Sequence, residues 1–195
     1  GGGGGGGGSR SRSMQEGWPL LRAIAEAGVW AGEMHYASGA ALSPAPFVLR
    51  GTTSIRIDDA FCTVQSSVVL PGGRQRVVRM RGVLPPVLGA GEACTARLEP
   101  ESGEGLISLL LSEHPGCIVL SELNRTSGEV VLASSMVLAH ADRSGHRTTL
   151  LTTSHELRRA AGTGLVEVGG VQMWRMAPLS ETQDEEEFMA SGSML

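Results

Sequence analysis

Lysine is absent from this chain, and aromatic residues are scarce. All sixteen basic residues are arginines, and Trp, Tyr and Phe together make up 4% of the 195 residues. Of the twenty acidic residues, five lie in the C-terminal segment, at Glu181 and at positions 184–187. The remaining acids and the arginines nearly balance, so the central part of the chain is close to neutral. A neutral domain lacks the basic surface that nucleic-acid binding requires.

Cysteine is also rare, and long apolar runs are missing. Cys62, Cys94 and Cys117 show no Cys-x-x-Cys spacing, and an odd number of cysteines excludes a complete disulfide framework. We therefore expect either a reducing compartment or one bridge with one free thiol. No apolar run approaches the ~20 residues that a membrane-spanning helix needs. The sequence predicts no transmembrane segment.

Both ends of the chain have the composition of low-complexity segments. Residues 1–16 contain eight leading glycines and then alternating Ser and Arg, and the chain begins without Met. We expect a fragment of a longer precursor. An Arg- and Ser-rich, acid-poor start is typical of organelle transit peptides, which favours a plastid; a disordered lead on a cytoplasmic protein is the alternative. Residues 179–195 are predicted to be an acidic, disordered tail.

Residues 17–178 between these ends are predicted to be a single all-β domain. A helical run over 18–27 ends at Gly28, after which the apolar period changes to two. Turn signals then separate about 8–10 strands at regular spacing. The turns are short, which favours an up-and-down meander, and closure removes unprotected edges. We therefore predict a closed antiparallel β-barrel with a short N-terminal helix. The predicted strands start at Val29 and continue over 47–57, 61–70, 74–83, 94–99, 106–113, 117–125, 130–140, 147–157, 165–168 and 171–176.

Polar and apolar residues mix on both faces of several predicted strands. This pattern suits a barrel with a partly polar cavity, and small closed barrels of about eight strands are wide enough for one small ligand. Polar residues turned outward from a solid core are the alternative. We predict a ligand site that combines residues of the first strand with polar groups from later strands: Trp30, Met34, Tyr36, Arg79, Glu122 and Ser134.

Trp30 and Arg175 are predicted to close the barrel. An arginine stacked on an indole contributes about 0.5–2 kcal/mol. Such a contact would join the first strand to the last, and Gly32, on the same face as Trp30, would leave room for the guanidinium.

Several short motifs resemble one protein superfamily. Gly28-Val29-Trp30 resembles the Gly-x-Trp signature of lipocalins and calycins, and Arg175 stands where those barrels place a basic residue. Other short segments are similar to uncharacterised lipocalin-like proteins of cyanobacteria and plastids, distant relatives of the phycobilin lyases: 97–99, 111–113, 121–123, 133–135 and 153–155. The resemblance covers about residues 28–178. It implies a calycin barrel around an amphipathic ligand such as a tetrapyrrole, a carotenoid or a lipid.

Catalytic and metal-binding patterns are weak by comparison. Ser154-His155-Glu156 cannot form a relay among its own members, because adjacent strand residues point to opposite faces. The five histidines show no metal-ligand spacing; His35 and His155 lie in predicted strands, where one of them could ligate a haem. We expect non-enzymatic binding of a small hydrophobic or amphipathic molecule. The alternatives are a lyase-like enzyme that handles a bilin, and a solid-core domain whose acidic tail recruits a partner.

Overall fold

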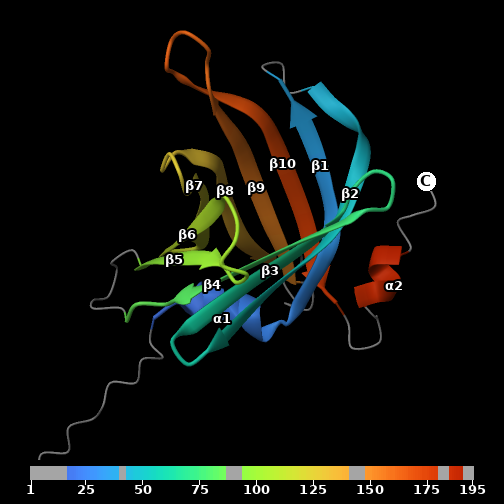
Figure 1. Cartoon of the computed structure of the whole chain (residues 1–195). Helices are drawn as coiled ribbons and strands as arrows, with labels where there is room; N and C mark the ends of the chain where they lie inside the picture. The colour runs from blue at the N-terminus through green and yellow to red at the C-terminus, as the bar shows by residue number, and fades with distance from the viewer. Residues whose placement is uncertain (1–16, 40–42, 87–93, 141–147, 180–184, 191–195) are drawn as a thin grey trace, which may run out of the picture.

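Ten strands form a closed barrel with one helix across an end (Figure 1). The computed structural model describes residues 17–39, 43–86, 94–140, 148–179 and 185–190. The elements in chain order are α1 (Pro19–Glu26), β1 (Val29–Ser38), β2 (Ser43–Asp58), β3 (Phe61–Val69), β4 (Gln75–Val83), β5 (Cys94–Pro100), β6 (Ile107–His114), β7 (Cys117–Asn124), β8 (Val130–His140), β9 (Thr148–Arg159), β10 (Val166–Pro178) and α2 (Glu185–Ala190).

Every strand pairs antiparallel with its neighbours in sequence, and β1 pairs with β10 to close the wall. The closing ladder runs from Trp30 opposite Pro178 to Ser38 opposite Gly170. The predicted all-β, up-and-down, closed barrel is therefore confirmed. A ten-stranded antiparallel barrel with a short helix at its N-terminus fits a calycin-like fold.

The predicted N-terminal helix is present as α1, and it closes one end of the barrel. Pro19 occupies its first turn, where the missing N–H has no intrahelical partner to lose. The helix ends before Gly28, which adopts a φ of +79° that favours glycine. Leu21 and Ile24 are fully buried against the core, and the indole Nε1–H of Trp30 donates to the carbonyl oxygen of Ile24 at 2.9 Å.

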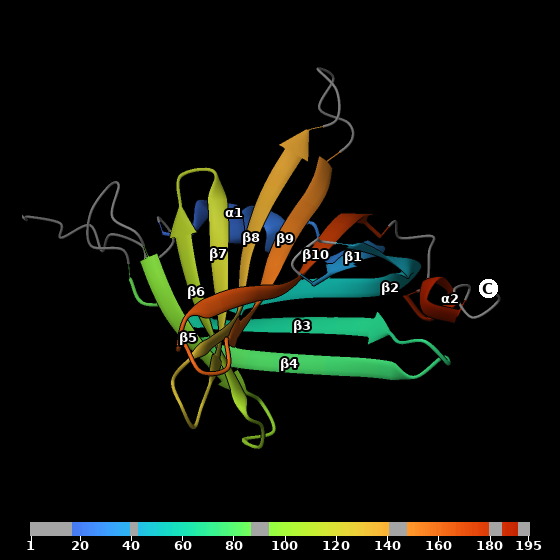
Figure 2. The same ribbon diagram turned by 90° about the horizontal axis from the view of Figure 1, so that it is seen from above.

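The antiparallel order fixes which turns lie at which end. The first residues of β1 and the last of β10 lie beside α1, so the hairpins β3–β4, β5–β6, β7–β8 and β9–β10 all turn at the opposite end, called the open end below. In Figure 1 the β9–β10 hairpin rises on the side away from α1. Figure 2 shows the same barrel from above, with β2, β3 and β4 seen along their length.

Strand β10 is longer than the sequence indicated. The pair Gly169-Gly170 separated two predicted strands, yet Val166–Pro178 is one strand with a register shift between Val168 and Gly170. A β-bulge accounts for the glycines, because a bulge absorbs one extra residue without ending the ladder. Similarly, β2 begins at Ser43, four residues before the predicted strand of 47–57.

The acidic C-terminal segment is not wholly solvated. Helix α2 packs on the outer wall at β2, where Thr52 Oγ1 donates to Glu185 Oε1 at 2.6 Å. The guanidinium of Arg50 lies 5.8 Å from the ring centre of Phe188, and Met189 is buried. No sequence pattern predicts this contact, since only two apolar residues, Phe188 and Met189, dock the helix.

None of the helices among the described residues has the length and apolar character that a membrane span needs. The three cysteines are all free.

Candidate ligand-binding cavity

The barrel encloses a cavity of about 450 Å³. Side chains from most of the wall contribute to its lining, with β1–β4 on one side and β6–β10 on the other. Four methionines are among them, and they come from four different strands: Met34, Met80, Met136 and Met176. Methionine is flexible and polarizable, so such a lining adapts to an irregular apolar guest.

Along β7–β10 and β1, the polarity of the lining changes in steps from the α1 end to the open end. Strand register places inward residues of neighbouring strands in rows along this part of the wall. The row on the α1 side is mainly apolar and contains Met136, Thr152, Trp174 and Met34. The next row carries hydroxyl and amide groups, at Ser134, Ser154, Gln172 and Tyr36. The third row contains two carboxylates, Glu122 and Glu156, on either side of Leu132.

Glycines in the wall make room for the two largest aromatic side chains near the cavity. A Cβ on Gly51 would stand 2.7 Å from Cη2 of Trp174, so the indole lies against this glycine, two strands away. A Cβ on Gly170 would stand 2.3 Å from the hydroxyl of Tyr36. The Tyr36 ring therefore crosses β10 at Gly170 and reaches β9.

Glu156 is held in place by this tyrosine. The hydroxyl of Tyr36 donates to Oε2 of Glu156 at 2.9 Å, and Nε2 of Gln172 donates to Oε1 at 2.9 Å. Close to this carboxylate, the hydroxyl of Ser134 donates to that of Ser154 at 2.8 Å. The β9 side of the open end thus carries two hydrogen-bonded sets of polar side chains.

The six residues proposed from sequence fall into three groups. Met34, Glu122 and Ser134 line the cavity. Trp30 lies beneath it, fully buried against α1, and Tyr36 lies at its edge through the contact with Glu156. Arg79 lies on the outer face, where its guanidinium donates to Gln65 and Glu101.

The proposed stacking of Arg175 on Trp30 is wrong. Arg175 is exposed on the outer face, where it lies opposite Glu33 in the β1–β10 ladder, whereas Trp30 points inward. Among the described residues, the cation–π contacts are Arg50 with Phe188 and Arg81 with Phe61. The closure itself depends on the backbone ladder between β1 and β10. The inward side chain that lies against Gly51 is that of Trp174, the residue before Arg175.

Among the lining residues that the sequence did not predict are three polar or charged ones and an indole: Arg76, Glu156, Gln172 and Trp174. A signal for Arg76 was present, because it alternates with Val78 and Met80, the apolar residues of β4 that point inward. The choice of Arg79 selected the opposite face of the same strand. No local signal marked Glu156, whose partners lie on β1 and β10.

Glu122 and Arg76 are the charged groups that face the cavity without a bonded partner. Burial raises the pKa of the Glu122 carboxyl above its usual range, and the positive charge of Arg76 acts in the opposite direction. Tyr36 also titrates abnormally: its pKa is raised mainly because its hydroxyl bonds to Glu156, and further by burial and by the charge of that carboxylate.

The wall is incomplete between β4 and β5. These strands pair only from Met80 to Gly82, and the Glu101 N–H donates to the carbonyl oxygen of Arg79 just beyond. Towards the open end, residues 75–78 of β4 pair with β3 alone. Figure 2 shows the β3–β4 hairpin diverging from β5 and β6. Arg76 lies in this half-paired stretch and is exposed, so solvent reaches it.

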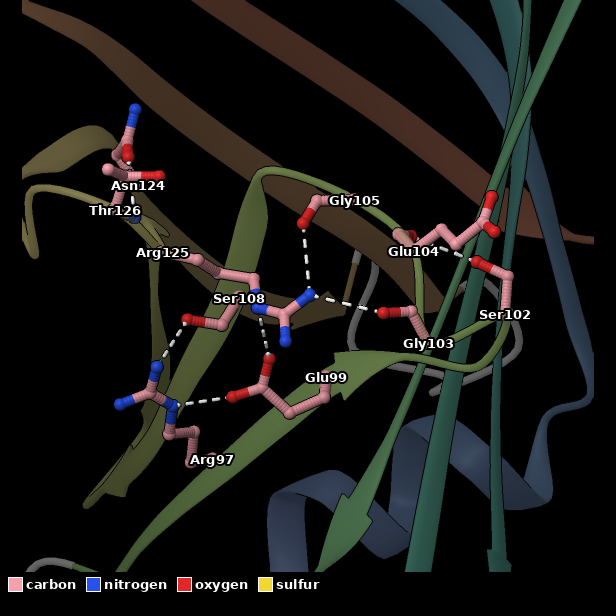
Figure 3. A network of polar contacts seen from close by, with 10 residues as sticks. All are labelled: Arg97, Glu99, Ser102, Gly103, Glu104, Gly105, Ser108, Asn124, Arg125 and Thr126. Atoms are coloured by element: carbon pink, nitrogen blue, oxygen red, sulfur yellow. Dashed lines mark hydrogen bonds and ion pairs between the residues drawn. The ribbon is translucent and has the colours of Figure 1, made fainter.

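A polar network braces the rim beside this gap (Figure 3). Oε1 of Glu99 forms an ion pair with Nε of Arg97 at 2.7 Å, and Oε2 of Glu99 lies 3.3 Å from Nε of Arg125. Nη1 of Arg125 also donates to the carbonyl oxygens of Gly103 and Gly105, at 3.3 and 3.0 Å. These contacts hold the β5–β6 turn against the end of β7 at the rim.

The residues with catalytic or metal-binding potential are dispersed. Ser154 and Glu156 line the cavity, whereas His155 between them is exposed on the outer face. His35 is likewise exposed on the outside of β1. Among the described residues, no group of three or more His, Cys, Asp or Glu side chains is placed to hold a metal ion.

No protein-family model matches the chain, and no curated protein matches it. Among solved structures, the chain is similar to the crystal structure of Rv2717c from M. tuberculosis. The two are 16% identical with a TM-score of 0.45, over 84% of this chain and 99% of that one. A likeness at this level supports no statement about the cavity.

Proposed function

We propose that this protein binds one small amphipathic molecule inside the barrel without chemically transforming it. The observation that carries the proposal is the stepwise polarity of the cavity wall along β7–β10 and β1, from Met34 and Trp174 towards α1 to Glu122 and Glu156 near the open end. A ligand with an apolar body and a polar end matches these steps in one orientation: body towards α1, polar end outward.

The size and lining of the cavity also support this function. Its volume of about 450 Å³ lies within the range of roughly 300–1,000 Å³ usual for small-molecule sites. A solid-core interaction domain would leave no such space. Because the walls are rich in methionine, the site suits a flexible or irregular apolar body, and lipids, tetrapyrroles and carotenoids are the classes to be compared.

Direct titration tests this function. Purified protein is titrated by calorimetry with a fatty acid, a haem or bilin, and a retinoid as a short carotenoid analogue. We expect saturable binding of one molecule per barrel for at least one class. Absence of saturable binding for all three classes would refute the proposal.

A matched pair of variants shows whether binding occurs inside. Leu120→Trp places an indole in the cavity, and Val119→Trp places the same group on the outer face of β7. We expect Leu120→Trp to abolish binding and Val119→Trp to retain it. Equal binding by both variants would place the ligand elsewhere.

A further inference from the structure

Two opposite charges line the cavity without a hydrogen bond or ion pair between them. Glu122 projects from β7 in the outermost row, and Arg76 projects from β4 beside the gap in the wall. No side-chain hydrogen bond or ion pair joins either of them to another described residue. Burial raises the pKa of the Glu122 carboxyl, and the positive charge of Arg76 acts to lower it.

Other charged groups nearby are already engaged. Both oxygens of Glu156 accept hydrogen bonds, from Tyr36 and from Gln172. Arg79, three residues beyond Arg76 on the same strand, is bound to Gln65 and Glu101 on the outside. Arg76 and Glu122 are therefore the charged lining groups, among the residues described, that remain available to a ligand.

We propose that Arg76 and Glu122 together hold the head group of a ligand that carries a carboxylate, and that binding takes up one proton at Glu122. This inference rests on the proposed function of the cavity. The guanidinium of Arg76 presents the paired donors that match a carboxylate. A protonated Glu122 can donate its O–H to the same head group, whereas an ionised one would repel it. The proton comes from solvent and resides on the Glu122 carboxyl, and no covalent bond changes.

The surroundings of Glu122 favour proton uptake. The inward residues directly opposite it are apolar: Leu109 on β6 and Leu132 on β8. Glu156 lies two strands away on β9, with its charge already stabilised by two donors, and Tyr36 on β1 faces Glu156. Arg76 on β4 is the charge that opposes protonation, and a bound carboxylate would neutralise it.

The same arrangement argues against a cationic head group. Arg76 is charged at every physiological pH and is exposed beside the gap, so the permanent charge at this site is positive. The negative charge of Glu122 is the one that burial disfavours. An alkylammonium ligand would have to bind next to the positive charge of Arg76 and depend on Glu122, whose ionised form burial disfavours.

Three ligands with the same tail test the inference: dodecanoate, dodecylamine and dodecanol. Their affinities are measured by calorimetry between about pH 6 and pH 8, where a free carboxylate with a pKa near 4 stays ionised. We expect dodecanoate to bind most tightly, with an affinity that rises as the pH falls. Titration in two buffers of different ionisation enthalpy should show net proton uptake for dodecanoate and none for dodecanol.

Single substitutions separate the two residues. We expect Arg76→Gln to weaken dodecanoate binding on the order of tenfold and to leave dodecanol unchanged, because one charge-assisted contact is lost. Arg79→Gln, on the outer face of the same strand, is the matched control and should bind like the wild type. Glu122→Gln should remove both the pH dependence and the proton uptake.

The outcomes distinguish this inference from the function on which it rests. If dodecanoate, dodecylamine and dodecanol bind equally at every pH, the cavity binds amphiphiles but the head-group site does not exist. If dodecylamine binds best and loses affinity in acid, Glu122 is a cation site and the inference is wrong. If none of the three binds and the other ligand classes also fail, the proposed function falls as well.

Discussion

Glu113 of β6 accepts a hydrogen bond from the backbone N–H of Leu21 in α1 at 3.0 Å, although 92 residues separate them. Its second oxygen accepts the N–H of Leu20 at 2.7 Å. A helix leaves its first N–H groups without intrahelical partners, and a carboxylate at that end satisfies them and complements the helix dipole. Glu113 is itself buried, so this one side chain fastens the closing helix to the barrel wall.

Removal of this carboxylate should loosen the closed end. We expect Glu113→Ala to lower the free energy of unfolding by about 1–3 kcal/mol, because two backbone donors lose a charged acceptor in a buried place. Urea denaturation measures the change. Glu104→Ala, in the exposed β5–β6 turn, is the control and should have almost no effect. A loss of equal size for both variants would contradict this role for Glu113.

The contact of Tyr36 with Gly170 makes a second prediction. Gly170→Ala should destabilise the barrel by about 1–3 kcal/mol, since the new methyl group overlaps the tyrosine ring. In a Tyr36→Ala background the same substitution should cost much less, and the double-mutant cycle isolates this interaction. Additive effects of the two substitutions would show that the ring does not occupy this space.

Arg175 should contribute little to stability. It is exposed on the outer face, so Arg175→Ala should change the free energy of unfolding by no more than about 0.5 kcal/mol. Trp30→Ala should cost about 3–5 kcal/mol, because it empties a fully buried site. Chemical denaturation of both variants checks the prediction, and a large loss for Arg175→Ala would restore the stacking interpretation.

Tyr36 is the only tyrosine in the chain, so its titration can be followed by absorbance without interference from another phenol. We expect its pKa to lie above the ordinary value of 10.0, and to fall towards that value in Glu156→Gln. Since the pKa is raised in the folded state, the associated stability is present below pH 10.0 and is lost as the pH rises through the folded-state pKa. An unchanged titration in Glu156→Gln would contradict the hydrogen bond.

The thiol of Cys62 should be unreactive in the native protein. It is fully buried, and burial raises its pKa to about 12, so almost no thiolate forms at neutral pH. Labelling with a thiol reagent followed by peptide mass spectrometry should modify Cys117, which is partly exposed, well before Cys62. Denaturation should make both equally reactive, which serves as the internal control.

The fold was readable from sequence because its signals are local. Turn residues such as Pro71-Gly72-Gly73 mark hairpins, and the alternation from Trp30 to Tyr36 defines an inner face without any knowledge of the partner strands. Gly169-Gly170 misled the same reasoning, because a bulge and a turn both use glycine. Only the pairing of Glu156 with Gly170 distinguishes the two.

The candidate site was less predictable because it depends on register between distant strands. Parity within β4 could have selected Arg76 over Arg79, given that Met80 faces the core. Whether Arg175 or Trp174 faces inward depends on which residue of β1 it pairs with, and sequence alone does not give that register. The partnership of Tyr36 with Glu156 spans 120 residues and leaves no local trace.

Sequential pairing of the strands has a consequence for how the chain folds. Nine of the ten strand pairings join neighbours in sequence, and the tenth, between β1 and β10, spans the whole domain. Hairpins can form independently within microseconds, but the final pairing must wait until the intervening strands have curled far enough to bring Trp30 to Pro178. Until then the sheet is open and has two unpaired edge strands, β1 and β10. We therefore expect the pairing of the first strand with the last to be the slowest and most aggregation-prone step of folding.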